Sequence, residues 1–99
     1  MDMFKMIKEA AAMKSRLADM EKSLRAQVIE VENRGVTVRM NGKSEMLDIK
    51  LSPELLKQDV SSIEKNVLSA VQQALKKSQD AMEQEARKIT GGMKIPGLM

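Results

Sequence analysis

The sequence of 99 residues contains no cysteine, histidine, tryptophan or tyrosine, and Phe4 is its only aromatic residue. Without cysteine the chain has no disulfides, thiolate metal ligands or cysteine nucleophiles. Without histidine it lacks the side chain that most often performs acid–base catalysis near neutral pH. No glycine-rich phosphate loop, pair of carboxylates or serine with a neighbouring base is evident. We therefore expect a protein that is not an enzyme and that binds no metal or cofactor.

Long hydrophobic runs are also missing. No stretch approaches the ~20 apolar residues that a membrane-spanning helix needs, and the N-terminus does not resemble a secretory leader. We expect a soluble, cytoplasmic protein with no membrane partner and no small-molecule substrate. The length allows a single domain, residues 1–99, whose core is built from Met, Leu, Val, Ile and Ala.

Residues 1–26 have the pattern of a long helix with an apolar seam. Apolar side chains recur at alternating spacings of three and four, and Asp2 is the expected N-cap. Four of the seam residues are methionine, and their spacing favours packing over a soft metal site. The seam consists of Met3, Met6, Ala10, Met13, Leu17, Met20 and Leu24.

Residues 27–51 change to the two-residue period of β-strands, which predicts a three-stranded antiparallel meander. The Asn41-Gly42 pair is typical of a tight hairpin, because both residues tolerate positive φ angles. If these two residues form the loop, Val36 lies opposite Leu47. The three strands place apolar side chains at Ile29 and Val31, at Val36, Val38 and Met40, and at Leu47, Ile49 and Leu51.

Residues 52–90 predict a short helical turn followed by a long helix. Ser52 and Pro53 form a helix-start signal, and a second start lies at Asp59. No glycine or proline interrupts the chain from there to Thr90, and Gly91-Gly92 is the expected end. The last segment, residues 91–99, is a tail that contains glycine and proline. The predicted fold class is therefore α/β, of the α+β type.

The two helices are too long for a short sheet to cover, so they should overhang it as an antiparallel arm. The apolar stripes left exposed favour a homodimer with a shared core. The predicted dimer interface consists of Met6, Met13, Leu17, Met20, Leu24, Val67 and Val71.

The net charge of +3 resides in this arm, because residues 1–26 and 76–99 each carry +2. Since the two helices are antiparallel, we expect both termini at the tip of the arm, with one basic cluster suited to phosphate contacts. Basic residues in the last turn of a helix are also common without any ligand. The predicted DNA contacts are Lys5, Lys8, Arg87, Lys88 and Lys94, and further contacts are Lys14, Arg16, Lys76 and Lys77.

Several stretches together resemble the YbaB/EbfC family of small bacterial nucleoid-associated proteins. They are MDMFKMIKEAAAMKSRLADMEKSL, VTVRMNG, LDIKLSPELL and the tail GGMKIPGLM. The resemblance implies a tweezer-like homodimer that binds double-stranded DNA with little sequence preference and influences nucleoid organisation or gene expression. Compared with the family pattern, the connection between the first two strands is short, Asn33-Arg34-Gly35, which suggests a tighter sheet edge.

A second hypothesis also fits the residues. Methionine-rich helical arms are suited to gripping a helix of a partner protein, in which case the positive charge only keeps the chain in solution. The sequence alone leaves this adaptor function open beside DNA binding.

Overall fold

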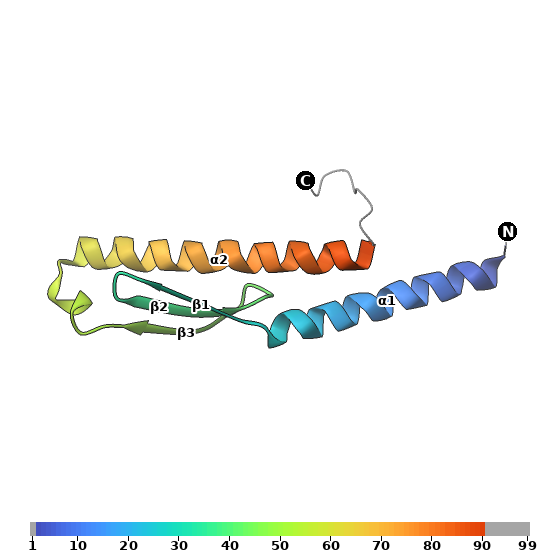
Figure 1. Ribbon diagram of the computed structural model, residues 1–99, viewed down its shortest axis with the longest axis horizontal. Coiled ribbons are helices and arrows are strands. Elements are labelled where there is room, and N and C mark those ends of the chain that lie inside the picture. The colour runs from blue at the N-terminus through green and yellow to red at the C-terminus, as the bar shows by residue number, and fades with distance from the viewer. Residues whose placement is uncertain (1, 91–99) are drawn as a thin grey trace.

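The computed structural model describes residues 2–90 as two long helices and one antiparallel sheet (Figure 1). The order of elements confirms the predicted fold class, and the predicted tail and helix end at Gly91-Gly92 lie outside the described residues. The elements are α1 (Met3–Ala26), β1 (Val28–Asn33), β2 (Val36–Asn41), β3 (Met46–Leu51), the 3-10 turn η1 (Leu55–Lys57) and α2 (Val60–Thr90).

Helix α2 lies along one face of the sheet, where it packs against β1 and β2 (Figure 1). Its contact face carries Ala70 and Ala74, whose small side chains let the helix axis approach the strands. The strands of the sheet are in the order β1-β2-β3, so β3 forms one edge. The buried core consists of Val31, Val36, Val38, Met40, Leu55, Ala70 and Ala74.

The tight hairpin turn joins β1 to β2 at Arg34-Gly35. Both residues have positive φ angles, 50° and 88°, as a two-residue turn of this kind requires, and Asn33 pairs with Val36. A side chain at Gly35 would meet Ser52, whose Cβ and Oγ lie close, and Ser52 N donates to Gly35 O at 2.8 Å. The short connection is therefore a two-residue turn that is held against Ser52.

The predicted pairing of β2 with β3 is wrong. Val36 lies opposite Leu51 rather than Leu47, and a β-bulge interrupts the ladder after Arg39. The side chain of Asn41 explains the shift, because its Oδ1 accepts hydrogen bonds from Lys43 N at 2.9 Å and from Glu45 N at 3.1 Å. These bonds hold residues 42–45 as the loop, so Asn41 remains in the strand instead of turning the chain.

Helix α1 begins as predicted and then leaves the body of the protein. The Asp2 carboxylate accepts a hydrogen bond from Phe4 N at 3.1 Å and caps the helix. With 24 residues, α1 is about 36 Å long, and its N-terminal part extends past the end of α2 (Figure 1). The molecule is 68 Å in its longest dimension. The N-terminal part of α1 is thus a projecting arm.

Three elements meet where this arm joins the body. Gly42 N donates to Leu24 O at 2.8 Å, and the Leu24 side chain is buried against Gly42. The hydroxyl of Ser78 on α2, also fully buried, donates to Asn41 O at 2.9 Å and is hydrogen-bonded to the Ser44 hydroxyl at 2.8 Å. The loop between β2 and β3 therefore holds both helices, and we call these five residues the elbow.

We predict that Gly42→Ala destabilises the fold by about 1–3 kcal/mol, because the new Cβ overpacks the elbow. It would lie 2.8 Å from Leu24 Cδ2 and 2.9 Å from Leu24 O. Urea unfolding followed by circular dichroism measures the loss. The cost of Gly42→Ala should be smaller in a Leu24→Ala background, since part of the clash is removed. Equal costs in both backgrounds would show that the two residues do not interact.

Candidate nucleic-acid interface

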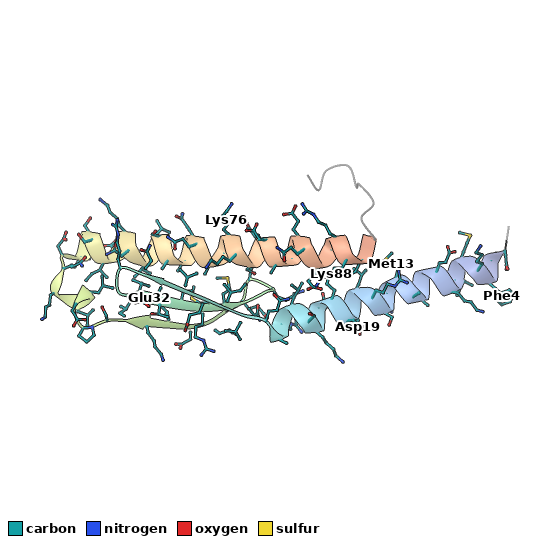
Figure 2. All side chains as sticks on the ribbon, in the orientation of Figure 1. Phe4, Met13, Asp19, Glu32, Lys76 and Lys88 are labelled. Carbon is teal, nitrogen blue, oxygen red and sulfur yellow. The ribbon has the colours of Figure 1, made fainter. Side chains whose placement is uncertain are left out.

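The basic residues of α1 lie along the projecting arm. Lys5, Lys8, Lys14 and Arg16 are all exposed, and none of them belongs to an ion pair within residues 2–90. Phe4 marks the tip of the arm, beyond the end of α2 (Figure 2). Side chains that make no ion pair in the protein keep their full charge for a polyanion. Helix α1 therefore presents four positive charges to the solvent, with Arg16 beside the end of α2 and the others nearer the tip.

The structure does not bring the basic residues of the two helices into one cluster at the tip. The last described turns of α2 lie beside the C-terminal half of α1, where Lys88 and Arg16 line one recess of about 550 Å³ with Asp19 and Glu85. Lys8 is eight residues before Arg16, which is about 12 Å further along the helix. The predicted tip cluster is wrong in this respect, because α1 overhangs α2 instead of ending level with it.

The basic residues at the end of α2 are paired with carboxylates of the same helix. Arg87 is bonded to Glu83 at 2.8 Å, and Lys88 to Glu85 at 3.1 Å. Exposed pairs of this spacing are weak, so an arriving phosphate can compete with the carboxylates. Arg87 and Lys88 are still candidate contacts, but they are partly neutralised in the isolated chain.

The remaining predicted contacts lie in different places. Lys76 and Lys77 are exposed on α2, and Lys76 stands on the side turned away from the sheet (Figure 2). Lys94 lies outside the described residues. Of the nine predicted DNA contacts, the structure thus brings Arg16 and Lys88 together, and it leaves Lys5 and Lys8 alone near the tip.

The apolar seam of α1 is mostly uncovered. Met6, Met13 and Leu17 are exposed, and Met20 is half-buried where α1 passes the end of α2. Leu24 is only 1% exposed because it packs within the elbow of its own chain. Leu24 therefore has no surface left for a partner, and we remove it from the predicted dimer interface.

On α2 the predicted interface residues Val67 and Val71 are half-buried against the core of their own chain. The more exposed apolar residues of this helix are Val60, Leu68 and Leu75, none of which belongs to the predicted interface. Ile49 and Leu51 on β3 are similarly exposed. The position of β3 at an edge of the sheet could have predicted this exposure, because a single helix most readily leaves an edge strand uncovered.

Two ion pairs link α1 to the loop of the elbow. Lys43 Nζ lies 3.1 Å from Glu21 Oε1, and Arg25 Nε lies 3.7 Å from Glu45 Oε1. The hydrogen bond from Lys43, and then its charge, lower the pKa of Glu21 below its ordinary value. Both pairs are exposed and add little stability. They supplement the packing of the elbow in orienting the arm.

Other kinds of site find no support in the described part of the chain. Within residues 2–90 no cluster of three or more acidic side chains is placed to hold a metal ion. None of the helices in this range combines the length and hydrophobicity that crossing a bilayer requires. The most prominent chemical feature is thus the set of exposed basic side chains on α1.

A small α+β body with a projecting helix that carries exposed basic side chains is an arrangement suited to a polyanion. The sequence profile of the YbaB/EbfC DNA-binding family matches residues 1–93, and the chain belongs to this family.

Similar proteins carry names that agree with this assignment. A nucleoid-associated protein of Thermoanaerobacter pseudethanolicus is 38% identical, with 94% of this chain and 86% of that protein aligned. One from Pelotomaculum thermopropionicum is 36% identical over 98% of this chain and 95% of its own length. The crystal structure of an uncharacterized Helicobacter pylori protein, HP0035, matches 92% of this chain and 99% of that chain with a TM-score of 0.84. At 20% identity this last match supports the fold alone.

We predict that Lys43→Ala raises the pKa of Glu21 toward its ordinary value, because the two largest causes of the lowered pKa come from Lys43. NMR titration of the Glu21 side-chain carboxyl carbon measures the change. The pair stabilises the fold at pH values above the ordinary glutamate pKa, and this contribution is lost as the pH falls through the lowered pKa of Glu21. Lys22→Ala, which removes an exposed neighbour, is the control. An unchanged titration of Glu21 in Lys43→Ala would contradict the contact.

Proposed function

We propose that this chain binds double-stranded DNA as a homodimer, through phosphate contacts from its arms and with little sequence specificity. The observation that carries the proposal is the set of four exposed basic side chains on α1, within a family described as DNA-binding. Lys5, Lys8 and Arg16 lie on one side of the helix over about 16 Å, which spans several phosphates of a duplex, and Lys14 lies on the opposite side. The core contact set is Lys5, Lys8, Arg87, Lys88 and Lys94, extended by Lys14, Arg16, Lys76 and Lys77.

The residue types on the arms favour positioning over sequence reading. Lysine and arginine bind phosphates whatever the base sequence, whereas reading needs side chains fixed against base edges. Apart from Phe4 the chain has no aromatic side chain that could stack on unpaired bases, which favours duplex over single-stranded ligands. The proposed role is to organise the nucleoid or modulate gene expression without catalysis. The names of the relatives support a location at the nucleoid.

The exposed apolar surface supports the homodimer. Met6, Met13 and Leu17 form a continuous stripe that nothing in the described chain covers. Apolar stripes of this kind on a small protein mark contact surfaces. A second copy would bury such surface and bring a second basic arm to the same ligand.

We predict a steep salt dependence of duplex binding, because each neutralised phosphate releases condensed counterions. If each subunit neutralises ~3–5 phosphates, the logarithm of the association constant should fall with the logarithm of salt concentration with a slope of about −2.7 to −4.5 per subunit. Fluorescence anisotropy with a labelled random duplex measures this slope. A flat dependence between low and moderate salt would contradict phosphate-based binding.

We predict that Lys5→Gln combined with Lys8→Gln weakens binding and reduces the magnitude of the salt slope by about 1 for each phosphate that the variant no longer neutralises. The matched control is Lys50→Gln with Lys57→Gln, which removes the same charge from exposed positions on the body. Light scattering should find both variants in the same oligomeric state as the wild type. An equal loss of affinity in the control would show that the bulk charge, not the arm, binds DNA.

The adaptor function is the second candidate, and the exposed methionine seam is the observation that favours it. In that case an added amphipathic peptide should perturb the NMR signals of Met6, Met13 and Leu17, and a duplex should leave the arm unperturbed.

A further inference from the structure

A recess lies at the end of the body far from the projecting arm. Three segments meet there: the turn between β1 and β2, the segment around η1, and the first turns of α2 (Figure 1). The recess has a volume of about 490 Å³, and pockets that bind small molecules measure ~300–1,000 Å³. No residue of α1 lines it. The recess is therefore separate from the arm to which DNA binding is assigned.

One side of α2 faces the turn between β1 and β2. Ser62, Lys65 and Asn66 are three and four residues apart, so they lie on neighbouring positions of the helix surface, and all three line the recess. Ser69 follows on the same side, and its hydroxyl accepts a hydrogen bond from Asn33 Nδ2 at 3.0 Å. Asn33 directly precedes the turn. This hydrogen bond therefore holds the turn beside the part of α2 that lines the recess.

The turn itself is packed tightly against the chain before η1. Arg34 and Gly35 have φ angles of 50° and 88°. A Cβ at Gly35 would lie 2.5 Å from Ser52 Oγ and 3.2 Å from Leu55 Cβ, so these segments approach as closely as a glycine allows. Leu55 is only 1% exposed and forms an apolar part of the lining. The lining is thus built from residues that the fold holds in place.

Two cations at the recess have no anionic partner. Arg34 and Lys65 are exposed, and neither forms an ion pair within residues 2–90. Among the described residues of the lining, Glu54 is the only acidic one, and it too forms no ion pair. A guanidinium group binds phosphate oxygens in pairs, and an ammonium group adds a compact positive charge. The two cations are therefore suited to one phosphate group.

The other acidic residues nearby do not neutralise these cations. The Asp59 carboxylate accepts a hydrogen bond from the Ser62 hydroxyl at the start of α2. Glu64 is about 200° from Ser62 around the helix axis, on the side turned away from the recess. Since Asp59 already occupies the start of the helix, the attraction for an anion comes from Arg34 and Lys65 and not from the helix dipole.

A buried amide adds a second kind of binding group. Asn66 is only 8% exposed, and its Nδ2 donates to Gln58 Oε1 at 3.3 Å. Within residues 2–90 its Oδ1 accepts no hydrogen bond, although buried polar atoms usually have a partner. Gln58 Nε2 likewise has no acceptor in this range, and both residues line the recess. The pair therefore offers an acceptor and donors to a polar group of a ligand.

We infer that this recess binds a small phosphate ester. Its phosphate lies between Arg34 and Lys65, its polar group meets the amides of Asn66 and Gln58, and its hydroxyl groups donate to the Glu54 carboxylate. A small molecule can reach the buried Asn66, whereas the surface of a duplex would meet only the exposed cations. The site shares no residue with the DNA contacts, so it stands or falls independently of the proposed function.

NMR titration of the ¹⁵N-labelled chain tests the site with three probes: adenosine monophosphate, inorganic phosphate and adenosine. Adenosine monophosphate should shift the amide signals of Gly35, Leu55 and Asn66 and reach saturation. Inorganic phosphate should shift the same signals with weaker affinity, and adenosine should shift them least, since it lacks the phosphate. If neither phosphate compound shifts these signals to saturation, the inference is wrong.

Arg34→Asn combined with Lys65→Gln removes both cations. Asparagine tolerates the positive φ angle of position 34, so circular dichroism should show an intact fold. The variant should bind adenosine monophosphate at least about tenfold more weakly, as the loss of one charge-assisted hydrogen bond does. The matched control is Lys50→Gln with Lys57→Gln, which removes the same charge outside the lining. An equal loss in the control would assign the binding to bulk charge and overturn the inference.

Two further measurements separate a phosphate ester from other ligands. Glu54→Gln should strengthen binding of inorganic phosphate about 1.5- to 5-fold, the range expected for one exposed charge, because a like charge is removed. Weaker binding in this variant would contradict an anion site. A random duplex should not displace adenosine monophosphate from the wild type. Displacement, with shifts at Gly35 and Leu55, would make the recess a DNA contact and overturn the inference.

Discussion

The arrangement of the molecule depends on the contact between Gly42 and Leu24. The backbone hydrogen bond between them is 2.8 Å long, and the leucine side chain fills the space that any other residue at position 42 would take. Ser78 fixes the same loop to α2 from the other side. Beyond its contacts with this loop, α1 touches the body mainly where residues 16–23 lie beside the end of α2. The elbow therefore fixes the direction of α1. It thereby also determines where the basic residues of this helix lie.

Most of the fold follows from local pattern. The heptad repeat of α1, its Asp2 cap and the uninterrupted final helix can each be predicted directly from the sequence pattern. The sequence pattern predicts a two-residue turn at Asn41-Gly42, but the loop there spans residues 42–45, and the two-residue turn with positive φ angles is Arg34-Gly35. Tertiary contacts, not local sequence preference, determine this loop. The Asn41-Gly42 pair suggests that Gly42 is needed for a tight turn, but Gly42 is needed because α1 approaches its backbone closely.

The candidate site was harder to predict than the fold. The residue types and the helices that carry them follow from the sequence, but their mutual distances depend on how far each helix extends from the elbow. Because α2 ends beside residues 16–23 of α1, Lys88 lies near Arg16 and not near Lys5. The same offset leaves the methionine seam without a helical neighbour toward the tip. The number of residues gives the length of each helix, but only the contacts of the elbow determine how far α1 extends past the end of α2.

DNA binding by the basic arms is tested by mapping where a duplex touches the protein. Amide chemical-shift changes of the ¹⁵N-labelled chain, titrated with a short random duplex, report contacts along the whole backbone. The largest changes should fall on α1 from Lys5 to Arg16 and on the last turns of α2. Changes concentrated on the outer face of the sheet, around Glu30, Arg39 and Asp48, with α1 unaffected, would contradict it.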